Sequence, residues 1–183
     1  MATVNILPAA DVSNSPAWTL STGSDVYALL DDDDTGTPSG DGSQITATAA
    51  GKKCVVQFQS FDNTGVSSID SVQAVIKHNN NTRGQSYKIG MTITNNGTGA
   101  ASWAEEVTGT ISASISWQTT TFTSRATSTS GGDDWEDTDI DNIAMEIHAD
   151  TLSGGTLRVT YAYFIVTYTT AVTDNSIFFG ANF

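Results

Sequence analysis

Positive charge is scarce in this sequence, and it contains no long hydrophobic run. Its 183 residues hold seven Lys and Arg against 20 Asp and Glu, which gives a net charge of −13. So few cations cannot neutralise a phosphate backbone, and this predicts no nucleic-acid partner. No apolar run approaches the roughly 18–20 residues that a membrane-spanning helix needs, so we expect no membrane association.

Cysteine and secretion features are equally sparse. Cys54 is the single cysteine, so no disulfide can form within the chain. It lies in the apolar run 54–58, which favours a buried and unreactive thiol. The first eight residues contain no cationic segment followed by an apolar stretch, so we expect no signal peptide.

Residues that commonly perform catalysis are few. The sequence contains two histidines, His78 and His148, and none of the common nucleotide-binding, serine-hydrolase or zinc-protease motifs. Both histidines fall near predicted strand ends, where surface or edge roles are expected. We therefore predict that the protein is not an enzyme and binds no cofactor.

Threonine, serine, asparagine and glycine dominate the polar residues, and helical periodicity is almost absent. Threonine favours strands, and clusters of Gly, Asn, Asp and Ser divide the chain into short segments. We expect an all-β fold: an antiparallel two-sheet β-sandwich, jelly-roll-like, with about 8–11 strands and at most one short helical turn. Residues 1–183 form a single domain in this prediction. Strands are predicted near residues 3–7, 17–20, 25–30, 44–48, 53–59, 68–78, 85–94, 103–110, 114–123, 143–149 and 155–169, and the helical turn near 137–143.

Three segments alternate clearly between apolar and polar residues. In residues 72–76 and 87–93 every second side chain is apolar, which places one face of each strand against a core. In residues 157–168 the odd-numbered positions are mostly apolar. Residues 79–84 and 95–99 are rich in turn formers, so we expect each to connect a hairpin.

Aromatic and acidic residues offer two further kinds of site. We expect Trp117 to lie in the core and Trp135 to close one end of it. In the alternative interpretation, Trp103 and Trp135 are exposed rings on which a carbohydrate stacks.

Three alternating carboxylates resemble the start of a calcium-binding loop. They belong to Asp137, Asp139 and Asp141, but Asn142 stands where such a loop has glycine, and His148 stands where it has glutamate. They are only weak Ca²⁺ candidates, and we predict no metal.

The order of these segments resembles a known group of proteins. The stretches that carry the resemblance are Ile6-x-Pro8 followed by Asp11, Trp18 to Gly23, Val26 to Asp31, Gln44 to Thr48, Val72 to Ile76, Trp117 to Phe122, Trp135 with Ile140 and Ile143, and residues 157–168. They are similar to tailed-bacteriophage virion proteins with jelly-roll-type β-sandwiches, which serve as capsid decoration (cement) proteins, head fibres and tail modules. The resemblance implies a structural protein and carries over no catalytic residues.

On this resemblance we expect a capsid decoration protein, made in the host cytoplasm and located on the outer capsid surface of the virion. The negative charge suits this position because an inner surface would face packaged DNA of the same sign. Expected partners are the major capsid protein or another virion protein, and further copies of the chain in a trimer or dimer. A carbohydrate-binding adhesion module and a tail or fibre module are the alternatives.

The chain ends are expected to make the assembly contacts. The N-terminal arm or first strand, residues 1–10, contains Ile6 and Pro8. The C-terminal extension, residues 171–183, contains four large apolar side chains, those of Ile177, Phe178, Phe179 and Phe183. Either end can add a strand or an apolar anchor to a neighbouring subunit. The alternative is that the phenylalanines fold back onto their own sandwich.

Overall fold

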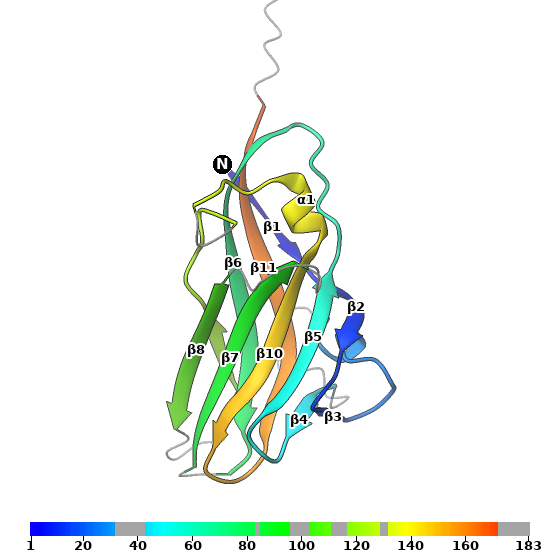
Figure 1. The fold of residues 1–183 in the computed structure, drawn as a ribbon, viewed down its shortest axis with the longest axis vertical. Helices are drawn as coiled ribbons and strands as arrows, with labels where there is room; N and C mark the ends of the chain where they lie inside the picture. Colours follow the sequence, from blue (N-terminus) through cyan, green and yellow to red (C-terminus); the bar gives the residue numbers. More distant parts are fainter. Residues whose placement is uncertain (32–42, 83–84, 96–102, 111–116, 129–131, 172–183) are drawn as a thin grey trace, which may run out of the picture.

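Two antiparallel sheets pack face to face in the computed structural model (Figure 1). The structure describes residues 1–31, 43–82, 85–95, 103–110, 117–128 and 132–171. Within these ranges, helix is limited to a five-residue α-helix, α1 (Asp137–Asp141), and a three-residue 3-10 turn, η1 (Tyr27–Leu29). The predicted all-β, two-sheet sandwich is confirmed, and so is the helical turn before residue 143.

The first sheet is built around two long central strands, β6 and β11. The order is β3-β4-β11-β6-β9, and β1 pairs with the upper part of β11, on the same edge as β4. Its strands are β1 (Ala2–Ile6), β3 (Thr19–Leu20), β4 (Ile45–Ala47), β6 (Val66–Asn80), β9 (Gln118–Thr121) and β11 (Leu157–Thr170).

The second sheet has the order β2-β5-β10-β7-β8. Its strands are β2 (Pro8–Ser13), β5 (Lys52–Phe58), β7 (Ser86–Asn95), β8 (Trp103–Thr110) and β10 (Ile143–Leu152). The prediction of a hairpin at residues 79–84 is wrong, because β6 and β7 belong to different sheets and this connection crosses between them. The expected pairing around residues 95–99 is confirmed, since β7 and β8 pair antiparallel.

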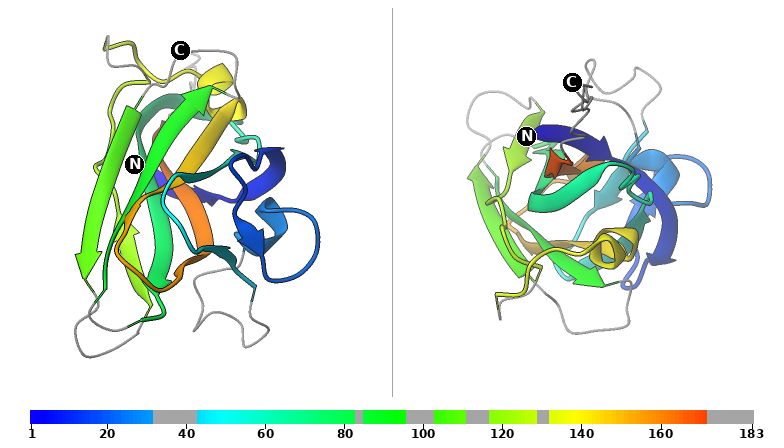
Figure 2. Two further views of the ribbon diagram at one scale, coloured as in Figure 1. Left: turned by 60° about the horizontal axis from the view of Figure 1, so that its bottom comes forward. Right: turned by 90° about the horizontal axis from the view of Figure 1, so that it is seen from above.

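Figure 2 shows the two sheets facing each other. Alternating side chains from both sheets form one core between them. Val72, Ala74 and Ile76 of β6 face it from the first sheet, as the alternation predicted. The odd-numbered residues of β7, from Tyr87 to Ile93, face it from the second sheet. Cys54 is fully buried in this core, as predicted, and desolvation raises the pKa of its thiol above the usual range.

The predicted apolar face of β11 is wrong beyond Val159. The pairing with β6 shifts register between Val159 and Tyr161, where β11 has one extra residue. Such a bulge exchanges the two faces of a strand. Leu157 and Val159 therefore face the core before the bulge. After it, the even-numbered residues Ala162 and Phe164 face the core instead of the odd-numbered ones. Tyr161 and Tyr163 instead stack on the opposite face, with ring centroids 5.4 Å apart.

Residues 25–30, predicted as a strand, contain the 3-10 turn η1 instead. Val26, Leu29 and Leu30 are buried, which is a helical spacing of three and four residues rather than an alternation. The carboxylate of Asp11 on β2 accepts hydrogen bonds from the backbone N–H groups of Val26 at 2.8 Å and Tyr27 at 2.7 Å. Strand β2, which carries this carboxylate, was not predicted.

One end of the sandwich collects both ends of the described chain. Ala2 at the start of β1 pairs with Tyr168 near the end of β11, and α1 lies at the same end (Figures 1 and 2). We call this the α1 end. Among the described residues, no helix has the length and hydrophobicity needed to cross a membrane.

Candidate functional site

The groups most suited to catalysis lie apart in the described part of the chain. His78 points into the core from the first sheet and is 1% exposed. His148 lies between the buried residues Ile147 and Ala149 of β10, so its side chain points to the outer face of the second sheet. Cys54 is inside the core. These three groups therefore do not form a nucleophile and base pair.

His78 is buried, which corrects the prediction of a surface or edge role. Its Nε2 lies 2.8 Å from the hydroxyl of Thr120 on β9, and its ring packs edge-on against Tyr87 with centroids 5.4 Å apart. Nδ1 has no hydrogen-bond partner. Burial lowers the pKa of His78 to about 4, because the charged form would lose its hydration. The imidazole is therefore neutral near pH 7.

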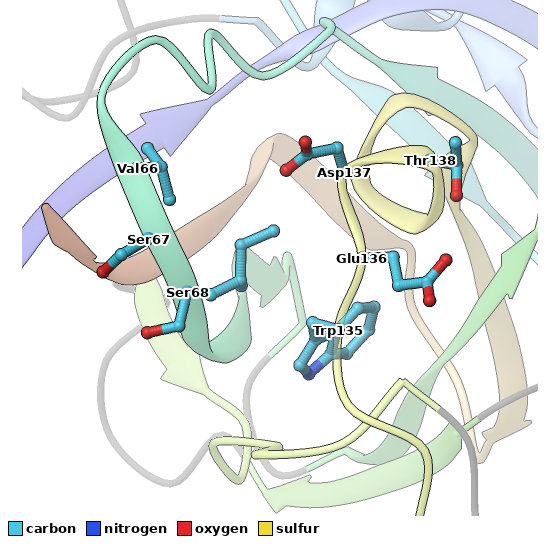
Figure 3. Close-up of a pocket in the computed structure, with 8 residues that line it drawn as sticks. Val66, Ser67, Ser68, Trp135, Glu136, Asp137 and Thr138 are labelled. Carbon is cyan, nitrogen blue, oxygen red and sulfur yellow. The ribbon is translucent and has the colours of Figure 1, made fainter. Parts of the chain in front are cut away.

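A shallow hollow at the α1 end, of about 390 Å³, lies between the start of β6 and the segment that enters α1. Figure 3 shows Val66, Ser67 and Ser68 on one side and Trp135, Glu136, Asp137 and Thr138 on the other. We call it the α1 groove.

Most polar groups of the α1 groove already have partners within the protein. The hydroxyl of Ser67 donates to the Thr169 carbonyl at 3.0 Å, and that of Ser68 donates to Asp70 at 3.0 Å. Asp137 accepts from the amide of Asn63. Glu136 takes part in a capping box that closes the first turn of α1. A polar ligand would have to replace these bonds, so the groove is poorly suited to one.

The three weak Ca²⁺ candidates point to different partners. Asp137 bonds Asn63, Asp139 accepts from the backbone N–H of Glu136 at 3.0 Å, and Asp141 accepts from that of Phe61 at 3.2 Å. Across the described residues, no three His, Cys, Asp or Glu side chains gather in a way that could hold a metal ion.

Trp135 is a core residue and not a platform. It is 6% exposed, and its indole N–H donates to the carbonyl of Arg125 at 2.8 Å. Trp117 was predicted to be in the core, but it is half-buried beneath the guanidinium of Arg158, at 5.4 Å from the ring centroid. The side chain of Trp103 lies outside the described part of the structure.

A second hollow, of about 370 Å³, runs along β1 at the α1 end, and we call it the β1 groove. Val4, Asn5 and Ile6 form one wall. Residues of the loop after β5, between positions 59 and 64, and Tyr168 and Thr170 of β11 form the others. Phe61 and Tyr168 meet edge-on in it, with ring centroids 5.4 Å apart. Val4 is 36% exposed, which makes this groove partly apolar and open to solvent.

Two of the predicted assembly contacts are buried within the protein itself. Ile6 is 3% exposed and pairs with Phe164, and Pro8 is buried where β2 pairs with Phe58. Their side chains are therefore not available to a neighbour, because residues 2–13 form two strands of the sandwich and not a free arm. The other predicted contacts, Ile177, Phe178, Phe179 and Phe183, lie outside the described residues.

Negative charge gathers at the α1 end. Carboxylates that line the hollows at this end or lie on α1 include those of Asp62, Asp70, Asp134, Glu136, Asp137, Asp139 and Asp141. Hydrogen bonds from Thr64 lower the pKa of Asp62, which keeps this exposed group ionised. Lysines lie toward the other end, where Lys53 pairs with Glu146 at 2.9 Å and Lys88 with Asp150 at 3.4 Å.

Comparison with known proteins leaves the chain without an assigned family. No protein-family model and no curated protein matches it. Among solved structures, a truncated AlyQ with CBM32 and alginate lyase domains aligns with a TM-score of 0.43 and 11% sequence identity, over 91% of this chain and 34% of that one. This chain therefore spans about a third of the length of that protein, and the similarity carries no argument about function.

Proposed function

We propose that this protein is a non-catalytic structural protein of a tailed-bacteriophage virion that decorates the outer capsid surface. It binds the major capsid protein or another virion protein, together with further copies of itself. The observation that supports this best is the open sheet edge of β1 at the α1 end, close to Thr170 near the end of the described chain.

The open edge of β1 supplies a way to bind without a catalytic site. In the described structure β1 pairs only with β11, so its second edge has no paired strand. Val4 on β1 is exposed, at 36%. Exposed edges with apolar side chains favour association through strand addition.

The charge supports an outward position. A chain with a net charge of −13 is repelled by packaged DNA, so binding to the outer face costs less electrostatic energy than binding to the inner face. The carboxylates at the α1 end would also favour a basic patch on the partner surface.

Gold-labelled antibody against the protein, applied to purified virions of the phage that encodes it, tests this proposal. Labels at many sites over the head are expected. Labels confined to the tail would support the tail or fibre alternative instead. Virions without any label, in a preparation where the major capsid protein is labelled normally, would contradict both.

The carbohydrate-binding alternative has a separate test. Applying the purified chain to a glycan array distinguishes this alternative from the structural role, since a carbohydrate-binding module should bind at least one class of sugar. The burial of Trp135 removes one of the two predicted aromatic platforms, and we therefore expect the chain to bind no glycan on the array.

A further inference from the structure

We propose that the β1 groove is the receptor for residues 172–183 of a neighbouring copy of this chain. This inference rests on the proposed assembly function and names the contact through which copies associate. It joins an apolar hollow, an open strand edge and a C-terminal segment rich in large apolar side chains.

The groove offers apolar surface of the right kind. Phe61 and Tyr168 form an aromatic pair on one side, and Val4 stands on the other, partly exposed. An aromatic side chain entering this hollow would lose part of its contact with water and gain contact with apolar side chains, including the two rings.

The backbone of β1 offers hydrogen bonds beside the groove. Thr3, Val4 and Asn5 are consecutive exposed residues, and β11 occupies only one edge of their strand. An extended segment laid along the other edge would bond to backbone groups that otherwise face water. Side chains of such a segment would alternate, so every second one would face the groove.

The C-terminal segment matches this surface in composition and in place. Residues 172–183 include Ile177, Phe178, Phe179 and Phe183, and only one charged side chain, that of Asp174. The segment starts at the groove, since Thr170 lines it and the Ala171 N–H donates to the Gly65 carbonyl at 2.7 Å. At about 3.3 Å per residue, twelve residues can span roughly 40 Å, which is enough to reach an adjacent subunit.

The direction of β11 favours a neighbour over the same copy. β11 runs antiparallel to β1, and Ala2 pairs with Tyr168, so Thr170 lies beyond the start of β1 and a segment of the same copy would have to reverse direction to lie along the open edge of β1. A segment from another copy has no such constraint. Because each copy would give one segment and offer one groove, the exchange closes into a symmetric dimer or ring.

Disulfide trapping between variants that each carry one added cysteine tests the proposal directly. Full-length Val4→Cys and full-length Phe179→Cys, carrying tags of different size, are mixed and mildly oxidised at a concentration where the wild-type protein self-associates. A mixed disulfide dimer should form on a non-reducing gel. Cys54 is buried, so the wild-type chain should give no cross-link.

The matched control is Val12→Cys, because Val12 has similar exposure but lies on the edge of the other sheet. Cross-linking of Phe179→Cys to Val4→Cys should exceed that to Val12→Cys at least tenfold. Equal yields would overturn the proposal. A chain that carries both Val4→Cys and Phe179→Cys provides the second arm: a fast-migrating monomer instead of linked copies would show that each tail folds onto its own groove, which would also overturn it.

Self-association measured by analytical ultracentrifugation gives an independent result. Val4→Asp should weaken association at least tenfold, whereas Val12→Asp should leave it unchanged, and far-UV circular dichroism checks that both fold. If copies associate and virion heads are labelled but neither Val4 variant differs from its control, the groove assignment fails and the proposed function stands. If the protein stays monomeric at every concentration, this inference fails and the virion labelling alone decides the function.

Discussion

Gly155, in the turn that leads into β11, has a backbone that other residues adopt only with strain. Its φ is +75°, and a Cβ there would lie 2.4 Å from Asn80 Oδ1 and 2.5 Å from Thr82 Oγ1. Both neighbours are held in place, because Asn80 donates to the Gly154 carbonyl at 3.0 Å and accepts from the Thr82 N–H at 3.0 Å.

Gly155→Ala is therefore expected to lower the free energy of unfolding by about 2–3 kcal/mol, through strain and crowding together. Gly51→Ala is the matched control, since Gly51 has a similar φ of +80° but nothing within 4 Å of the added methyl. That control should lose only about 1 kcal/mol. Urea denaturation measures both, and equal losses would show that crowding at Asn80 and Thr82 contributes nothing.

His78 should make stability depend on pH between about 4 and 6.5. Its pKa is about 4 in the folded protein, against 6.5 without burial, so in this range the unfolded chain binds a proton that the folded chain does not. The free energy of unfolding therefore falls as pH falls through this window, by about 3 kcal/mol in total. Above pH 6.5 the imidazole has no effect, because it is neutral in both states.

His78→Gln should flatten this dependence, whatever its effect on stability at pH 7. His148→Gln should keep it, because His148 is on the outer face of the second sheet. Urea midpoints measured at half-unit steps from pH 4 to pH 7 give the slopes. Parallel slopes for wild type and His78→Gln would contradict the assignment.

At the scale of single elements, the turn η1 depends on a carboxylate from another strand. Asp11 on β2 accepts from the N–H groups of Val26 and Tyr27, which an isolated turn would leave without acceptors. Asp11→Ala should therefore lower the free energy of unfolding by about 1–2 kcal/mol. Asp25→Ala is the control, because the contact of Asp25 is with the adjacent Ser24 hydroxyl at 3.2 Å, and it should change stability by less than about 0.5 kcal/mol. Equal effects in thermal or urea unfolding would contradict a capping role for Asp11.

This turn also shows where the sequence was insufficient. Val26, Tyr27 and Leu30 are compatible with a short strand, and the acceptor that fixes a turn instead lies about fifteen residues earlier, on a strand that local pattern did not indicate. The same limit applies to residues 79–84. Their turn-forming composition shows that the chain reverses, but composition does not say whether the next strand joins the same sheet or the opposite one.

Strand β11 shows a different limit. Its odd-numbered positions are mostly apolar along its whole length, so alternation alone predicts that they face the core throughout. Both of its faces carry apolar side chains, however, so the pattern does not show where the core face changes. A single extra residue near Thr160 exchanges the faces, and no composition signal marks it. By contrast, β7 and the first part of β6 have one apolar face each, and their core residues were predicted correctly for that reason.

For the whole molecule, the sequence identified the fold class but placed the binding surface only in outline. It pointed to the chain ends, yet Ile6 and Pro8 proved to be buried, and the neighbouring Val4 is the exposed residue. The β1 groove could not be inferred from sequence, since β1, the loop after β5 and the end of β11 are far apart in the chain and meet only through sheet pairing.

A core shared by both sheets also determines how the molecule should unfold. One cluster of buried residues extends from Trp18, before β3, to Trp135, before α1, and takes side chains from both sheets, such as Phe164 on β11 and Phe58 on β5, whose rings lie 4.6 Å apart. Separating the sheets would expose all of this surface at once, so partly unfolded states should be unstable.

We expect one transition in urea, with the same midpoint by tryptophan fluorescence and by far-UV circular dichroism. A calorimetric enthalpy equal to the van't Hoff enthalpy should accompany it. Two separate transitions, or a fluorescence midpoint distinct from that of the backbone signal, would show that the sheets unfold independently and that the chain does not behave as a single domain.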